Sequence, residues 1–183
     1  MKTKKKKSSS AAPNQEPMPV GILTLLLKDH RAMKELMANL KEDKTNTKRF
    51  ATFRKLEKLI HSHMIAEEKS FLEKIKNNPK FEDEAVEGLE EHEIHRVVIA
   101  SIHRVKDADR RYVRMKSFCE ILTHHLREEE EELFPEYKRH TAKVTRRRVG
   151  RSFLKTRKKS NLNSKGLGAL EPIDLETGET KSP

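Results

Sequence analysis

The sequence predicts an all-α fold: an antiparallel up-down-up-down four-helix bundle with disordered basic tails at its N- and C-termini. The chain of 183 residues has no tryptophan and only six glycines and seven prolines, a composition that favours helix. Four stretches place apolar residues at spacings that alternate between three and four, as one face of a helix requires. Short connections between these stretches favour antiparallel neighbours.

The distribution of charge divides the chain into three parts. The net charge of +11 lies in residues 1–19 and 141–183, whereas residues 20–140 are neutral, with 24 basic and 24 acidic side chains. We therefore predict one folded domain over residues 20–140. Residues 1–19 are predicted to be a disordered basic tail, and residues 141–183 a basic, largely disordered tail with at most one short helix.

The first helix is predicted to start near Val20, after two prolines, and to reach Leu40. Its apolar stripe consists of Leu23, Leu26, Met33, Met37 and Leu40. The stripe keeps helical spacing only if His30 fills the gap after Leu26, so His30 is predicted on the buried face. Residues 41–47 are polar and are predicted to form a loop.

The second helix is predicted over about residues 48–77 and ends at Asn77-Asn78-Pro79. Its stripe consists of Phe53, Leu56, Ile60, His63, Glu67 and Phe71. The histidine and the glutamate are four residues apart, which places them one above the other on one helix face.

The third helix is predicted over about residues 83–105, followed by a short connection. Its stripe consists of Ala85, Leu89, His92, Ile99 and Ile102, with His95 on or near the same face.

The fourth helix is predicted over about residues 110–139, with a kink or an end near Phe134 because Pro135 follows. Its stripe consists of Met115, Phe118, Leu122, His125, Glu129 and Leu133. We choose His125 over its neighbour His124 because His125 is in phase with Leu122. Three other glutamates of this run, Glu128, Glu130 and Glu131, are assigned to the surface.

Six polar residues therefore fall on apolar stripes: His30, His63, Glu67, His92, His125 and Glu129. Singly, each has an ordinary explanation, as a hydrogen-bonded core histidine, an i,i+4 pair or part of an acidic surface. Together they favour a metal site, because unpaired imidazoles and carboxylates are costly to bury. The remaining histidines, His61, His103, His124 and His140, lie off the stripes and are predicted to be exposed.

Four imidazoles and two carboxylates without a thiolate suit iron, with manganese as the alternative, in a two-metal site that the carboxylates can bridge. Structural zinc suits this set of six residues less well, because it prefers four ligands that close the site. A ferritin-like centre requires Glu-x-x-His on two helices. No histidine of this chain has a glutamate three residues before it, so that family is disfavoured.

The motifs resemble those of the hemerythrin-like domain, also called the HHE cation-binding domain. The matching segments are D-H at Asp29-His30, H-M-I-A-E-E from His63 to Glu68, E-H at Glu91-His92, and H-L-R-E-E-E-x-x-L-F-P from His125 to Pro135. The resemblance covers about residues 20–140 and implies a four-helix bundle around two oxo- or hydroxo-bridged non-haem iron ions. It implies that His30 and His63 bind one iron, that His92 and His125 bind the other, and that Glu67 and Glu129 bridge them.

The third helix departs from the oxygen-carrying members, which supply an additional ligand there through an H-x-x-x-H pair. Arg96, which cannot ligate, stands four residues after His92, and His95 is the remaining candidate. The set is more similar to iron-cluster-repair, stress-response and regulatory iron-sensing members. We expect a protein that senses or binds dioxygen, nitric oxide or peroxide, or handles iron in stress response. The alternative is a di-iron enzyme: a peroxidase, a nitric oxide reductase or an iron-cluster-repair protein. We lean toward a non-enzyme.

The basic segment after His140 suggests a third class of function, association with nucleic acid or another polyanion. The candidate contacts are Arg146, Arg147, Arg148, Arg151, Lys155, Arg157, Lys158 and Lys159. A solubilising tail is an equally weighted alternative, since no aromatic platform accompanies the charge. The single cysteine, Cys119, and the lack of an apolar run before Val20 predict a cytoplasmic protein that does not insert into a membrane.

Overall fold

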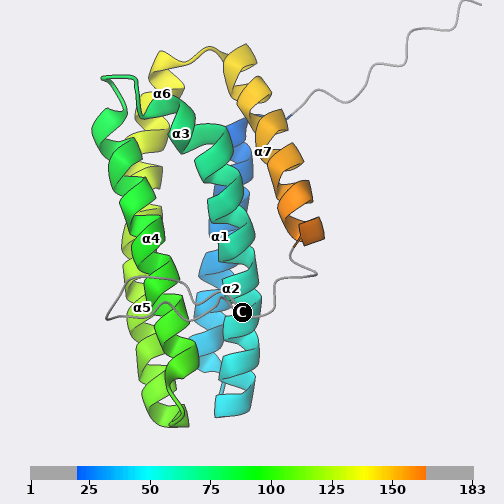
Figure 1. The fold of residues 1–183 in the computed structure, drawn as a ribbon, viewed down its shortest axis with the longest axis vertical. Helices are drawn as coiled ribbons and strands as arrows, with labels where there is room; N and C mark the ends of the chain where they lie inside the picture. Colours follow the sequence, from blue (N-terminus) through cyan, green and yellow to red (C-terminus); the bar gives the residue numbers. More distant parts are fainter. Residues whose placement is uncertain (1–19, 164–183) are drawn as a thin grey trace, which may run out of the picture.

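The computed structural model describes residues 20–163; residues 1–19 and 164–183, for which we predicted disorder, lie outside this range. The described part contains helices and no strand, which confirms the all-α prediction. Four long helical columns run side by side, and a further helix, α7, crosses one end of them (Figure 1). None of the helices within residues 20–163 combines the length and the apolar character needed to cross a membrane.

The first half of the bundle consists of two columns. Helix α1 spans Ile22–Glu42 and is followed by α2, Asn46–Glu67, whose first turn is capped by Thr45 accepting a hydrogen bond from the backbone N–H of Lys48 at 3.3 Å. The second column continues through the π-helical segment η1, Glu68–Leu72, and the short helix α3, Glu73–Ile75. The predicted second helix is therefore one column with a π turn inside it.

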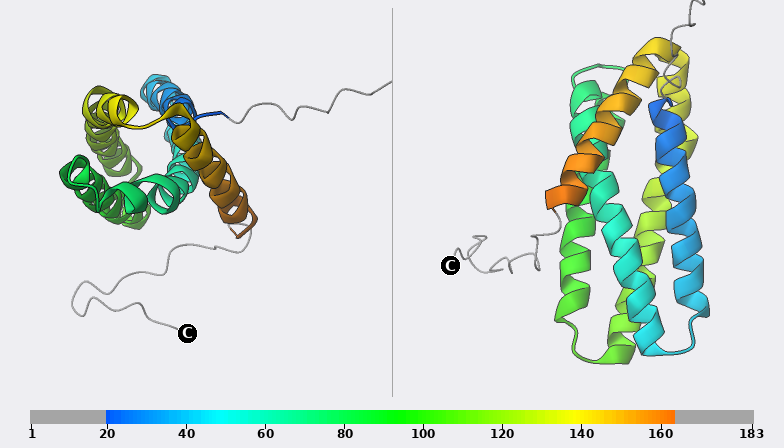
Figure 2. Two further views of the ribbon diagram at one scale, coloured as in Figure 1. Left: turned by 90° about the horizontal axis from the view of Figure 1, so that it is seen from above. Right: turned by 90° about the vertical axis from the view of Figure 1, so that its right-hand side faces the viewer.

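The second half repeats this plan. Helix α4 spans Glu82–Arg104, and α5 spans Ala108–Glu128, capped by the Asp107 side chain. The last column continues through η2, Glu129–Leu133, into α6, Phe134–His140. Successive connections lie at opposite ends of the bundle (Figure 2).

The kink or end predicted near Phe134 falls at the junction between the π segment η2 and α6. Helix α6 begins at Phe134, which puts Pro135 in its first turn, where proline is tolerated because that backbone N–H needs no partner.

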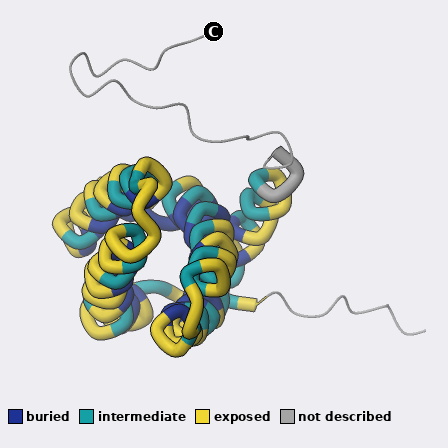
Figure 3. Tube along the Cα trace, turned by 90° about the horizontal axis from the view of Figure 1, so that it is seen from below, coloured by how far each residue is buried: buried dark blue, intermediate teal, exposed yellow. Residues whose placement is uncertain are grey.

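The core consists of two apolar clusters, one toward each end of the bundle, and the buried residues line the inside of the columns (Figure 3). Along α1 the first cluster ends at Met33 and the second at Leu26, so His30 lies between them. The same order holds on α4, where Ala85 and Ile99 flank His92. The polar residues of the stripes therefore occupy one level of the bundle, closed above and below by apolar packing.

The prediction of a largely disordered tail after residue 140 is wrong for residues 143–163, which form α7, Lys143–Asn163. This helix packs on α1, α2 and η1 (Figure 2). Phe153 is fully buried in the second apolar cluster, and Val149 packs against the same cluster. Two further apolar side chains of α7, Val144 and Leu154, are exposed.

Gly150 is the point of closest approach between α7 and the start of α1. A Cβ atom built at this position would lie 2.3 Å from the backbone oxygen of Val20 and 3.0 Å from the backbone nitrogen of Ile22. Backbone cannot yield as a side chain can, so only glycine fits here.

We predict that Gly150→Ala lowers the free energy of unfolding by about 1–3 kcal/mol, the range for overpacking a close contact. Gly88→Ala is the matched control, because its Cβ would meet only Leu72 at an ordinary 3.5 Å, and alanine favours helix. Urea unfolding followed by circular dichroism compares the two. Equal stability of both variants would contradict the close packing of α7 on α1.

Candidate metal centre

The structure brings all six polar residues of the stripes together at one level of the bundle. His30 comes from α1, His63 from α2, His92 from α4 and His125 from α5. Glu67 is the last residue of α2, and Glu129 is the first of η2. All six side chains are buried, none more than 4% exposed.

A carboxylate holds the Nδ1 atom of each imidazole on the first two helices. His63 Nδ1 lies 3.0 Å from Asp29 Oδ2, and His30 Nδ1 lies 2.9 Å from Glu130 Oε1. An ionised carboxylate can only accept a hydrogen bond, so each Nδ1 carries the proton that it donates. In the neutral ring this leaves the lone pair on Nε2, the atom that faces the middle of the bundle.

The other two helices repeat this arrangement. His92 Nδ1 lies 2.9 Å from Glu68 Oε1, and His125 Nδ1 lies 2.6 Å from Glu91 Oε2. All four imidazoles therefore donate outward to a carboxylate and present Nε2 inward. This pairing of histidine with an outer carboxylate is the usual support of a metal-ligating histidine.

The Nε2 atoms and the two inner carboxylates converge. His92 Nε2 and His125 Nε2 are 3.3 Å apart, and they lie 3.8 Å from Glu67 Oε2 and 3.7 Å from Glu129 Oε2, respectively. On the other side, His30 Nε2 is 3.3 Å from Glu129 Oε2, and His63 Nε2 is 3.0 Å from Glu67 Oε2. Each glutamate thus lies between histidines of both sides.

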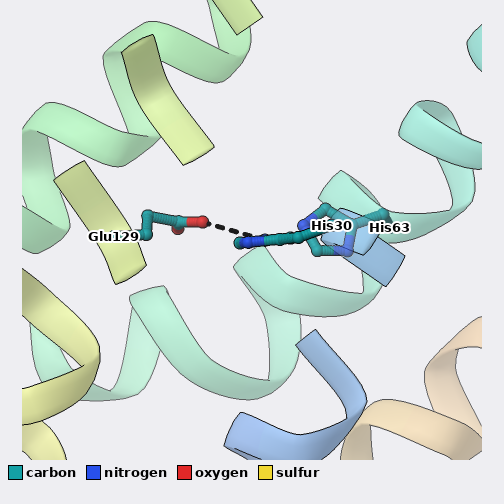
Figure 4. A group of neighbouring side chains, drawn as sticks. All are labelled: His30, His63 and Glu129. Atoms are coloured by element: carbon teal, nitrogen blue, oxygen red, sulfur yellow. Dashed lines mark ion pairs between the residues drawn. The ribbon is translucent and has the colours of Figure 1, made fainter. Parts of the chain in front are cut away.

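One group of three has the spacing expected of ligands to a single ion. Ligand atoms of His30, His63 and Glu129 all lie within 4.8 Å of one another, with the rings and the carboxylate directed at a shared space (Figure 4). Across the bundle, His92 Nε2 lies 3.3 Å from His125 Nε2 and 3.8 Å from Glu67 Oε2.

Most of the inner atoms lack hydrogen-bond partners within the described residues. This is the case for both oxygens of Glu67, both oxygens of Glu129, and the Nε2 atoms of His30 and His63, although these two nitrogens stand at ion-pair distance from Glu129 and Glu67, respectively. The Nε2 atoms of His92 and His125 lie within hydrogen-bond distance of each other. Buried polar atoms of native proteins are nearly always paired. Imidazole nitrogens and carboxylate oxygens that face one another in this way suit the coordination of a divalent cation of the first transition row.

The two inner carboxylates have opposite pKa shifts. Burial and the nearby Glu67 raise the pKa of Glu129 to about 8. For Glu67, burial also acts to raise the pKa, but the charge of His63 and its contact outweigh it, and the pKa falls to about 2. Two carboxylates this close cannot both ionise easily without a cation between them.

The imidazoles of His30 on α1 and His63 on α2 also have opposite pKa shifts. Burial, followed by the proximity of His63, lowers the pKa of His30 to about 4. Burial acts in the same direction on His63, but Glu67 and Asp29 outweigh it and raise its pKa to about 10. His63 is therefore doubly protonated and positively charged at neutral pH in the metal-free protein. A cation that binds Nε2 displaces the proton on that atom.

His95, which sequence reasoning left undecided, lies inside the centre. It is fully buried, and neither of its ring nitrogens has a hydrogen-bond partner among the described residues. Its ring centre is 5.1 Å from that of His125 and 6.2 Å from that of His92. Burial lowers its pKa to about 3, which keeps the ring neutral and able to ligate.

Sequence reasoning missed the roles of the four outer carboxylates, Asp29, Glu68, Glu91 and Glu130. Each directly precedes or follows an inner residue, so an acidic residue next to a residue of the stripe was the available signal. The assignment of Glu130 to the surface is wrong, since it pairs with His30 and also with Lys34 at 2.7 Å. A neighbouring residue on a helix points about 100° away, so only the packing of a second helix gives it a partner.

The predicted exposure of the other histidines is confirmed for His103, His124 and His140, whereas His61 is half-buried. The basic residues of α7 separate onto two faces. Arg157 pairs with Asp29, and Arg146 donates to the backbone oxygens of Lys138 and Thr141. The other six candidate contacts lie at one side of the helix by its 3.6-residue period: Arg147, Arg148, Arg151, Lys155, Lys158 and Lys159.

The comparison with protein families gave one match: the model described as Hemerythrin HHE cation binding domain covers residues 21–137. No curated protein and no solved structure matched the chain.

We predict that Glu129→Gln stabilises the metal-free protein at high pH. Because the pKa of Glu129 is raised from 4.5 to about 8, its stabilising contribution is complete below pH 4.5 and is lost as the pH rises through 8. Glutamine keeps the shape without the charge, so at pH 8.5 the variant should exceed the unchanged protein by about 1–3 kcal/mol in free energy of unfolding. The pH dependence of His63 has the same sign but is common to both proteins.

Urea unfolding from pH 5 to 9 measures this difference, and Glu131→Gln, an exposed glutamate of the same segment, is the control. The control should follow the unchanged protein at every pH. If the free energies of unfolding of Glu129→Gln and of the unchanged protein changed with pH in parallel, the pKa of Glu129 would not be raised in the folded state.

Proposed function

Because the chain belongs to the hemerythrin HHE cation-binding domain family, we propose that it holds two non-haem iron ions and uses them to sense or bind dioxygen, nitric oxide or peroxide, or to handle iron in stress response. One observation carries the proposal. Four imidazoles present Nε2 to a buried space that also contains two carboxylates without hydrogen bonds. Such a donor set suits iron, with manganese as the alternative.

The proposed ligands divide by the distances between them. One ion would take His30 and His63, the other His92 and His125, and Glu67 and Glu129 would bridge. We add His95 as a fifth imidazole on the second side. Its two unpaired nitrogens and its distance from His125 support this assignment. The two sides are then unequal, with one more histidine on the α4 and α5 side.

The bound iron would supply open coordination positions for a small ligand. The chain supplies orientation, since each outer carboxylate fixes the tautomer and the angle of one imidazole. It also excludes water, because apolar clusters close the centre at both ends. A cavity of about 440 Å³ reaches Glu130 and Phe134, and the Phe134 ring stacks on that of His30 at 5.5 Å, which supports entry of a small molecule from this side.

Burial of the whole donor set favours a ligand of two to four atoms over a large substrate, and so binding or sensing over general catalysis. A di-iron peroxidase, a nitric oxide reductase or an iron-cluster-repair protein would use the same residues. Turnover of peroxide or nitric oxide by the iron-loaded protein distinguishes these enzymes from a binding protein, which would form one complex per centre and stop.

A second candidate function is binding of nucleic acid or another polyanion through α7. The helix orders six cations on its outer face, whereas its inner face docks on the bundle through Phe153 and Arg157. A rigid row of cations neutralises phosphates without reading sequence. This feature favours a polyanion more strongly than a disordered basic tail did.

We predict that the protein, loaded anaerobically with iron(II), binds two iron ions per chain by elemental analysis. The double variant His125→Ala with Glu129→Ala should bind at most one, because it removes one ligand from one side and a bridge between both. His124→Ala is the control, since this neighbour is exposed and pairs only with surface groups. Full loading of the double variant would refute the proposed ligands.

We predict that the triple variant Arg151→Gln, Lys155→Gln, Lys158→Gln binds duplex DNA at least about tenfold more weakly at low salt. The dependence of log K on log salt concentration should become shallower by about 3, close to one unit for each phosphate that the variant no longer neutralises. Fluorescence anisotropy measures both quantities.

The matched control removes three exposed lysines around the connection from α1 to α2, at the end of the bundle away from α7: Lys41→Gln, Lys44→Gln and Lys48→Gln. It changes the net charge equally and should keep affinity near that of the unchanged protein. Equal losses in the two triple variants would show that net charge, and not the row on α7, determines binding.

A further inference from the structure

Helix α7 lies outside the four columns, yet two of its side chains contact the surroundings of His63. Arg157 donates two hydrogen bonds to the Asp29 carboxylate, one of them to Oδ1 at 3.0 Å. Oδ2 of the same carboxylate accepts the Nδ1–H of His63 at 3.0 Å. A guanidinium fork fixes a carboxylate in both position and plane, which a single contact cannot do.

A second residue of α7 covers the same imidazole. The fully buried Phe153 packs edge-on against His63, with ring centres 6.3 Å apart. The Arg157 guanidinium in turn lies 4.5 Å from the centre of the Phe153 ring. One turn of α7 thus both orders the outer carboxylate of His63 and shields its ring from solvent.

The other outer carboxylates do not depend on α7. Glu130 is held by Lys34 of α1, and Glu68 by Arg96 of α4, so their partners belong to the bundle. Within the described residues, Glu91 contacts no cation besides His125. The His63 side is therefore the one side of the centre whose orientation relies on a helix added to the bundle.

We propose that α7 is a fifth wall of the metal centre, and that Arg157 is a positioning residue that acts through Asp29 to hold His63 ready for the ion on the His30 side. This inference rests on the proposed two-ion centre. Docking of α7 then determines how firmly one ion is retained and leaves the other ion unaffected. A helix that bears a row of cations on its outer face thereby controls one half of the centre from its inner face.

The test measures release of iron(II) from the loaded, full-length protein to an excess of chromogenic chelator without oxygen. Arg157→Met should accelerate release of one ion by about tenfold, the lower end of the effect of a supporting residue on metal affinity, and leave the second ion unchanged. Arg157→Lys restores the charge without the fork and should give an intermediate rate.

Arg31→Met is the control, because it removes a positive charge from an exposed position two residues from Asp29. Its release curve should match that of the unchanged protein. Urea unfolding of each metal-free variant identifies any that fail to fold. A purely structural role for Arg157 would accelerate both ions together and would not distinguish lysine from methionine.

Equal acceleration of both ions, or equal rates in Arg157→Met and Arg31→Met, would overturn the fifth wall and leave the two-ion centre intact. Absence of bound iron(II) in the unchanged protein would overturn both.

Discussion

Four imidazoles on four different helices must turn Nε2 toward one another inside an apolar bundle, and a closed cycle of carboxylates imposes this orientation. Each column supplies one imidazole and holds the imidazole of its neighbour. Glu130 holds the histidine of α1, Asp29 that of α2, Glu68 that of α4 and Glu91 that of α5. Because every column takes part in two of these pairs, turning any one of them breaks two hydrogen bonds at once. The cycle therefore sets the rotation of each helix as well as the tautomer of each histidine.

This arrangement opposes stability at its own centre. Glu67 and Glu129 are buried close together, and within the described residues their oxygens face imidazole nitrogens: His63 Nε2 lies 3.0 Å from Glu67, and His30 Nε2 lies 3.3 Å from Glu129. The apolar clusters on both sides must offset this cost, and a bound cation would offset it directly, since a ligand that binds only the folded state stabilises it. Charged groups buried in an apolar core, against the usual preference for the surface, are expected at functional sites.

Two local devices adapt regular helices to this task. Both H-x-x-x-E pairs run directly into a π segment, η1 after Glu67 and η2 from Glu129. A π turn shifts the phase of the residues around it, and such turns are frequent at functional sites. Adjacent glutamates can then serve different partners: Glu67 and Glu129 face inward, whereas Glu68 and Glu130 reach the histidine of another helix. On the His63 side alone, helix α7 supports the outer carboxylate as well, because Arg157 donates to Asp29.

The sequence by itself determined the four helical stretches and the six inner residues, because helical period is a local property and a polar residue in phase with an apolar stripe is visible without a fold. Tertiary structure alone decided which histidines pair with Asp29, Glu68, Glu91 and Glu130. It also decided that His95 is buried beside His125 and that α7 docks on the bundle. Each of these depends on which surface a second helix presents, and the period of one helix carries no information about its neighbour.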